Sequence, residues 1–171
     1  PVRSTNFHDP NAPRLEAKGP FVPGRPRKGA VSLIVLHADL ASSSARTVEI
    51  LQERRLSEHF EIDGDGHIYQ LVDPKLRAAH AGSHNDRSIA ITLNNPSTNL
   101  KRASEEKKRE LAAHFAARGE QRDVVEGRVQ GLRIRQYGYT DAQYASLAAL
   151  VRVLQSAYPR IGTHIPRDGD G

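Results

Sequence analysis

The sequence contains no cysteine, no methionine and no tryptophan, and only 5% of its residues are aromatic. Without cysteine the chain forms neither disulfides nor thiolate metal ligands, so any metal site must use histidine and carboxylate side chains. No run of about 18 apolar residues is present, and we therefore expect no membrane span. The first residues also lack the basic-then-apolar pattern of a signal peptide.

Positive charge is in excess, with 25 Lys and Arg against 20 Asp and Glu and a net charge of +5. A basic chain favours a polyanionic partner such as nucleic acid, anionic cell wall or a membrane surface. The most basic segment, residues 101–118, alternates cations with glutamates and has no interleaved aromatic side chains. Its composition argues against nucleic-acid binding.

At 171 residues the chain is expected to form one domain. Residues 1–30 hold six of the ten prolines and show no periodicity, which predicts an extended N-terminal arm. Residues 31–171 would then form the domain itself. Within it, residues 97–139 are interpreted as an insertion on the edge of the main sheet.

The run Val31–Leu36 is almost entirely apolar, a pattern that predicts a fully buried central strand. His37 follows directly. A histidine at the mouth of a buried strand is held rigidly and suits a metal ligand. Since strand ends often carry polar residues, the alternative is a histidine that caps the strand with a satisfied hydrogen bond.

Further elements follow from periodicity and from turn and capping residues. The expected elements are a helix from Ser42–Ser44 to about Arg54, a hairpin over 60–72 turning at Asp63–Gly66, a strand over Ser88–Leu93, a helix over 101–118, a hairpin over 124–137, and a helix that begins with a capping box at Thr140 and ends before Pro159.

Several motifs, taken in order, resemble one family, the zinc-dependent N-acetylmuramoyl-L-alanine amidases. This family is related to phage lysozyme-type amidases and to peptidoglycan-recognition proteins. The similarity covers roughly residues 31–95 and 139–164. The segments that carry it are Ile34–His37, Glu58–Val72, Ala79–Gly82, Asn85 with Ser88–Asn94, and Tyr139–Tyr144.

The resemblance implies an α/β fold with a mixed central β-sheet flanked by helices and a groove for peptidoglycan across the strand ends. The helix over 101–118 and the hairpin over 124–137 would be inserted at its edge. It also implies a Zn²⁺ ion bound by two histidines and a third ligand. Zinc polarises the scissile carbonyl and lowers the pKa of its bound water to about 7. His37 stands at the first ligand position and His164 near the second. Asp168 and Asp170 are candidates for the third.

The catalytic position departs from the family pattern. Thr92 stands where many members place an acid/base glutamate, and a hydroxyl cannot perform that role near neutral pH. Glu58 stands where lysozyme-type members carry a catalytic tyrosine. We therefore expect Glu58 to supply the carboxylate, the alternative being an exposed glutamate at a strand end. His80 and Asn85 of the groove loop are expected to contact substrate.

Two functions remain open from the sequence. The first is a zinc hydrolase that cleaves the amide between N-acetylmuramic acid and L-alanine. The second is a peptidoglycan-binding module that lacks a complete zinc site. In either case peptidoglycan or its muropeptides are the expected partner, and a second chain or a further C-terminal segment would complete the zinc site. A cell-envelope location, periplasmic or secreted, is expected.

Overall fold

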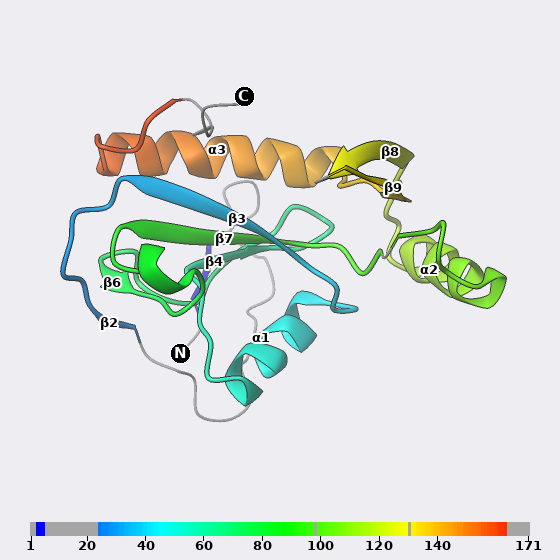
Figure 1. Cartoon of the computed structure of the whole chain (residues 1–171), viewed down its shortest axis with the longest axis horizontal. Helices are drawn as coiled ribbons and strands as arrows, with labels where there is room; N and C mark the ends of the chain where they lie inside the picture. The colour runs from blue at the N-terminus through cyan, green and yellow to red at the C-terminus, as the bar shows by residue number, and fades with distance from the viewer. Residues whose placement is uncertain (1–2, 6–23, 98, 130, 164–171) are drawn as a thin grey trace.

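A mixed five-stranded sheet lies at the centre of the computed structural model, which describes residues 3–5, 24–97, 99–129 and 131–163. Helix α3 covers one face of the sheet and helix α1 lies below the other (Figure 1). Its strands are, in spatial order, β1 (Arg3–Thr5), β5 (Ile68–Gln70), β4 (Phe60–Ile62), β7 (Ser88–Asn94) and β3 (Leu33–Asp39). The β4, β7 and β3 strands run parallel to one another, whereas β5 pairs antiparallel with β4 on one side and with β1 on the other. The mixed α/β class predicted from the sequence is confirmed.

The long strand that is buried throughout is β7, which lies between β4 and β3, and not the strand that precedes His37. All seven residues of β7 are buried. Within the described residues β3 pairs only with β7, and Leu36 of β3 is 53% exposed. The prediction of a fully buried central strand over Val31–Leu36 is therefore wrong, because an apolar run does not reveal which strands flank it.

The main core lies between the sheet and α3 (Asp141–Ala157). Side chains alternate along strands, so Ile89, Ile91 and Leu93 of β7 all point toward α3, as their spacing predicted. Leu150 and Leu154 of α3, which are about one helical turn apart, pack against these side chains. This core leaves the opposite face of β7 free for polar side chains.

Helix α1 (Ser44–Glu53) packs against that opposite face through a smaller apolar cluster. Val48 of α1 contacts Tyr69 and Leu71, with Leu51 partly buried beside them. The Ser43 hydroxyl accepts a hydrogen bond from the Arg46 amide and caps the helix, as the serine cluster predicted. The helix is short, and its apolar contacts with the sheet are made near β5, at Tyr69 and Leu71.

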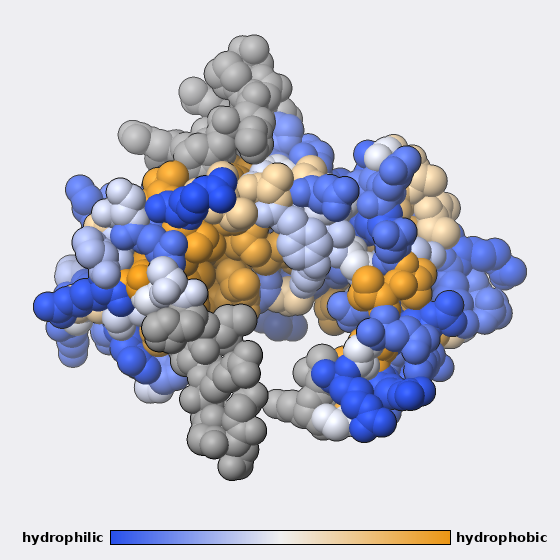
Figure 2. Space-filling model, turned by 90° about the horizontal axis from the view of Figure 1, so that it is seen from above, coloured by the Kyte–Doolittle hydropathy of each residue, from blue (hydrophilic) through white to orange (hydrophobic). Residues whose placement is uncertain are grey.

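Residues 99–139 contain α2 (Glu105–Ala117) and the hairpin of β8 (Val124–Val129) and β9 (Leu132–Tyr137), which lie beyond one end of the sheet (Figure 1). They have a small core of their own, formed by Leu100, Leu111 and Phe115. Their outer surface is mostly hydrophilic on the face shown in Figure 2. The proposed division into an arm, a domain and an insertion stays a prediction.

A second small sheet joins β2 (Arg25–Pro26) to β6 (Leu76–Arg77) near the loop that contains the short helix η1 (Gly82–His84). In the part of the chain that the structure describes, we find no helix with the length and apolarity needed to cross a bilayer.

Candidate active site

A row of polar side chains crosses the α1-facing side of the sheet. His37 of β3 is in register with Thr92 of β7, and Thr92 is in register with Glu61 of β4. Their neighbours along the strands, such as Ile91 and Ile62, point into the α3 core. Cross-strand neighbours in register share a face, so the three polar groups form a line under the sheet.

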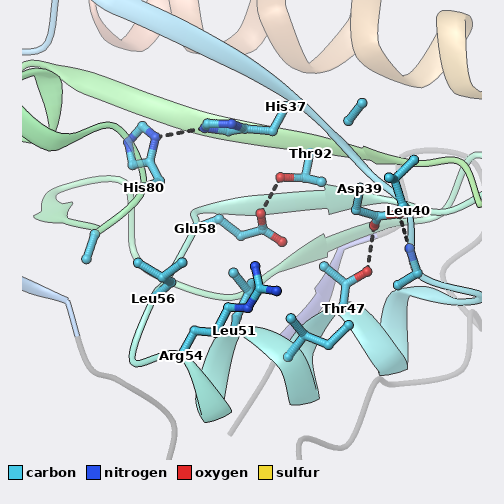
Figure 3. A pocket seen from close by; sticks show the side chains of 14 residues that line it. His37, Asp39, Leu40, Thr47, Leu51, Arg54, Leu56, Glu58, His80 and Thr92 are labelled. Carbon is cyan, nitrogen blue, oxygen red and sulfur yellow. Dashed lines mark hydrogen bonds between the residues drawn. The ribbon is translucent and has the colours of Figure 1, made fainter. Parts of the chain in front are cut away.

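A cavity of about 470 Å³ opens between this row and α1 (Figure 3). Its sheet side carries His37, Glu58 and Thr92, and its other wall is largely apolar. A concave, mostly apolar site with a few convergent polar groups is the usual form of a ligand-binding cleft. The lining residues are His37, Ala38, Asp39, Leu40, Ala41, Thr47, Ile50, Leu51, Arg54, Leu56, Glu58, Ala79, His80 and Thr92.

A chain of hydrogen bonds determines which nitrogen of His37 carries its proton. The Ser88 hydroxyl donates to the carbonyl of His84 at 2.7 Å, so it must accept from Nε2–H of His80 at 3.1 Å. Nδ1 of His80 is then an acceptor, and Nε2–H of His37 donates to it at 3.0 Å. The other nitrogen of His37, Nδ1, carries a lone pair and accepts no hydrogen bond within the described residues.

This arrangement requires both imidazoles to be neutral, and their surroundings favour that state. Burial, together with the nearby His37 and His59, lowers the pKa of His80 to about 3. Burial also lowers the pKa of His37. A neutral imidazole with one bare nitrogen is the form that binds a metal, and a hydrogen bond from the other nitrogen fixes its orientation.

Glu58 lines the cavity but is buried, with only 3% of its surface exposed. The exposed alternative considered for this glutamate is therefore wrong. Its Oε2 accepts a short hydrogen bond from the Thr92 hydroxyl (Figure 3). Burial raises the pKa of Glu58, while hydrogen bonds from Glu61 and Thr92 oppose that shift. A carboxyl group with a raised pKa can exchange a proton near neutral pH.

His59 has a structural role and is fully buried. Its Nδ1 accepts from the Ala90 amide at 2.9 Å, so its Nε2–H donates to the carbonyl of Leu76 at 3.0 Å. Burial and the adjacent Arg27 guanidinium hold its pKa at about 4. His59 thus ties β4 to β7 and to the β6 segment.

Comparison with protein families gives a match over residues 27–170, nearly the whole chain, to the model described as N-acetylmuramoyl-L-alanine amidase. The chain belongs to the N-acetylmuramoyl-L-alanine amidase family. The suspected resemblance is therefore confirmed. Comparison with curated proteins found no match.

Solved structures of amidases share this fold. The endolysin N-acetylmuramoyl-L-alanine amidase LysCS from Clostridium intestinale is 20% identical, with a TM-score of 0.53 over 85% of this chain and 74% of that one. AmpDh3 from Pseudomonas aeruginosa is also 20% identical, with a TM-score of 0.53. That match covers 92% of this chain but only 54% of the longer AmpDh3 chain. At this level of identity the likeness establishes the fold.

The amidase family implies zinc, and the described residues fit one part of such a site. His37 lines the cavity and has a neutral imidazole with one nitrogen free to bind a metal, as a zinc ligand requires. Among the residues that the structure describes, no group of three or more histidine or carboxylate side chains suited to a metal is found. His164, Asp168 and Asp170, which the amidase resemblance suggests as further ligands, lie outside the described residues. Their roles stay predictions.

The structure places the other predicted residues in two different settings. His80 lines the cavity beside His37, and its expected substrate contact stays a prediction. Asn85 is buried and does not line the cavity. Its Oδ1 accepts from the amides of His80 and Ala81 at 3.0 and 2.6 Å, which shapes the loop that holds His80. The substrate role expected of Asn85 also stays a prediction.

Sequence reasoning missed Glu61 and Asp39, which lie close to Glu58 under the sheet. One signal for Glu61 was available. It stands between Phe60 and Ile62 in a predicted strand, so alternation places it on the face opposite the apolar core. The sequence does not reveal that this second face is also buried.

Proposed function

We propose that this chain is a peptidoglycan hydrolase that cleaves the amide between N-acetylmuramic acid and L-alanine with the help of a zinc ion. The family match supports the amidase class. The observation that carries the proposal is the cavity in which a metal-competent His37 and a buried Glu58 line the same wall. The sugar–peptide junction of a muropeptide is the substrate.

His37 would hold the zinc through Nδ1, with His164 as a second ligand. Bound zinc supplies a Lewis acid for the amide carbonyl and makes hydroxide available at neutral pH. His80 keeps the His37 ring in the Nε2–H tautomer, so that Nδ1 stays free of a proton. The ligand is therefore oriented before the metal arrives, which lowers the cost of binding.

Glu58 is the proton carrier in this proposal. Its carboxylate accepts a proton from the attacking water as the new C–O bond forms. It then delivers that proton to the amide nitrogen as the C–N bond breaks, and L-alanine leaves with a free amino group. The Thr92 hydroxyl donates to Glu58 Oε2 and so orients the carboxylate instead of exchanging protons itself.

The apolar wall and Arg54 provide the contacts for the rest of the substrate. Leu51 and Leu56 line the cavity wall opposite the sheet (Figure 3). Arg54, at the end of α1, adds a cation to that wall. A stem peptide carries carboxylates, which a guanidinium binds well. AmpDh3 has been crystallised with an anhydromuramic pentapeptide, a ligand of this chemical class. We accordingly propose a cell-envelope location, periplasmic or secreted, where such a substrate is found.

Paired measurements of metal content and cleavage test the proposal. We expect one zinc per chain, and we expect His37→Ala to lose both the metal and the release of peptide from muropeptides. Glu58→Gln should keep the metal but lose at least about 10²-fold in kcat, because general acid–base catalysis contributes roughly 10²–10⁴-fold. Exposed His84→Ala, from the cavity loop, is the matched control and should retain both properties.

The alternative is a module that binds peptidoglycan without cutting it. Thr92, at the centre of the row of polar side chains, favours this binding module, because a hydroxyl stands where many family members have an acid/base glutamate. Muropeptide binding by a protein that takes up no zinc and releases no peptide would establish this alternative and contradict the hydrolase.

A further inference from the structure

Three carboxyl groups converge under the sheet without a cation among them. Glu61 is fully buried at the middle of β4, Glu58 is buried just before β4 begins, and Asp39 ends β3. No ion pair joins any of the three to a Lys, Arg or His within the described residues. Three adjacent negative charges in a buried site would repel strongly, so at least one proton must be shared among them.

Asp39 is well supplied with donors. Its oxygens accept from the Thr47 hydroxyl at 2.5 Å, from Nδ2 of Asn94 at 2.9 Å, and from the backbone amides of Ala41 and Asn95 at 3.2 and 3.3 Å. An ionised carboxylate can only accept hydrogen bonds, and several donors stabilise its charge. These four donors satisfy the oxygens of Asp39 without a proton from a neighbouring carboxyl group.

Glu61 lacks such donors. Neither of its oxygens receives a hydrogen bond from an N–H or hydroxyl group in the described residues. A buried polar oxygen without a partner is costly, and a carboxyl group in this position is satisfied only by donating its own proton. Glu58 and Asp39 both lie within hydrogen-bonding reach of Glu61. Asp39 already has four donors, whereas Glu58 has only the Thr92 hydroxyl at Oε2 and no donor at Oε1. Glu58 is therefore the acceptor that lacks a partner.

We propose that Glu61 is a positioning residue that stays protonated and donates a hydrogen bond to the Glu58 carboxylate. Together with the Thr92 hydroxyl, it fixes Glu58 from two sides. In the proposed amidase reaction Glu58 then takes up and releases the proton, whereas Glu61 keeps its own proton throughout. The inference thus rests on the proposed function and adds a second carboxyl group to it.

The charged groups around Glu61 are consistent with a neutral side chain. Glu58 and Asp39 both face it, and Tyr69 of β5 is its cross-strand neighbour. From the α1 side Arg54 lines the cavity but is exposed and forms no ion pair with the carboxyls in the described residues. Burial and the adjacent Glu58 raise the pKa of Glu61 well above its usual range.

The test compares Glu61→Gln with Glu61→Leu. Glutamine keeps a donor for Glu58, so we expect kcat within about threefold of the parent and an unchanged acidic limb of the kcat–pH profile. Leucine removes the donor. Since donors to a carboxylate lower its pKa, the acidic limb should then move to higher pH, with kcat at least about tenfold lower and KM little changed.

Infrared spectroscopy provides a readout that does not depend on activity or on Glu61→Leu folding. At pH 7 the parent should show the carbonyl stretch of a protonated carboxylic acid, and Glu61→Gln should lose it. Glu120→Gln is the matched control, because the Glu120 side chain is only 3% exposed but is paired with the guanidinium groups of Arg118 and Arg122. Its substitution should leave the band in place.

The outcomes separate this inference from the proposed function. A parent protein without the acid band, or a Glu61→Leu variant whose acidic limb does not move, overturns the role of Glu61. A parent protein that shows the band, but does not release peptide from muropeptides, contradicts the amidase proposal instead.

Discussion

At the scale of single residues, a chain of hydrogen bonds determines which nitrogen of each histidine in the site carries a proton. Ser88 has one hydroxyl proton and gives it to the carbonyl of His84, and this determines the tautomer of His80 and then that of His37. A partner that fixes a metal-binding imidazole typically contributes 10–100-fold to metal affinity. The bare Nδ1 of His37 is therefore a consequence of groups that would not themselves bind the proposed zinc ion.

The His80→Ala variant tests this chain of hydrogen bonds. We expect zinc affinity to fall by about 10–100-fold, because the His37 ring loses the acceptor that orients it. Long-range nitrogen-15 spectra of the apo protein should show the Nε2–H tautomer of His37 in the parent and a mixture in the variant. His84→Ala should change neither property. Unchanged zinc affinity and tautomer in His80→Ala would contradict the assignment.

At the scale of secondary-structure elements, α3 is attached to the sheet by its first turn as well as by its apolar face. The Thr140 hydroxyl accepts from the Gln143 amide and donates to the carbonyl of Gly64 at 2.7 Å. The Gln143 side chain completes the capping box and also donates to the carbonyl of Asn94 at 2.9 Å. The helix N-terminus is thus bonded to both the β4–β5 turn and the end of β7.

The same contact explains a glycine in that turn. Gly66 has a φ of +86°, and a Cβ placed there would lie 2.9 Å from the Ala142 carbonyl oxygen. Any side chain at this position would both strain the backbone and collide with α3. The hairpin turn and the helix start therefore depend on each other.

Removal of the Thr140 hydroxyl should destabilise the fold measurably. We expect Thr140→Ala to lower the free energy of unfolding by about 1–2 kcal/mol, since it loses a helix cap and leaves the buried Gly64 carbonyl without its donor. Thr140→Ser keeps the hydroxyl and should lose less. Urea denaturation measures both. Equal losses in the two variants would show that the methyl group, and not the hydroxyl, stabilises this junction.

The elements themselves were largely predictable from the sequence, whereas their neighbours were not. The capping box at Thr140 and the Asp63–Gly66 turn are local patterns, and the structure confirms both. The edge position of β3 depends on which strands flank it, which no local pattern encodes. Glu61 was missed for the same reason, because alternation gives the face of a side chain but not what covers that face.

At the scale of the whole molecule, stability depends on pH through buried titratable groups with opposite effects. The folded pKa of His59, about 4, lies below the unfolded value of 6.5, so the unfolded chain binds more protons between these values. The free energy of unfolding then falls as pH drops from about 6.5 to about 4. Glu61 has the reverse effect, because its folded pKa is raised above the usual value for glutamate. Its contribution to the free energy of unfolding is present at low pH and is lost as the pH rises through the folded pKa.

His59→Gln isolates the histidine contribution. We expect the variant to be less stable than the parent at pH 7, because Gln does not reproduce the bonds to Ala90 and Leu76. The difference should narrow toward pH 4, by at most about 3 kcal/mol. Urea denaturation at several pH values measures it, with exposed His84→Ala as the control. A difference that stays constant with pH would contradict the neutral, buried state of His59.

The proposed hydrolysis of the bond between N-acetylmuramic acid and L-alanine is tested most directly by mass spectrometry of the products when the zinc-loaded protein is incubated with a defined muropeptide. We expect two products, a sugar with a free lactyl carboxylate and a stem peptide with a free L-alanine amino group. An intact muropeptide, or a cut at any other bond, would contradict it.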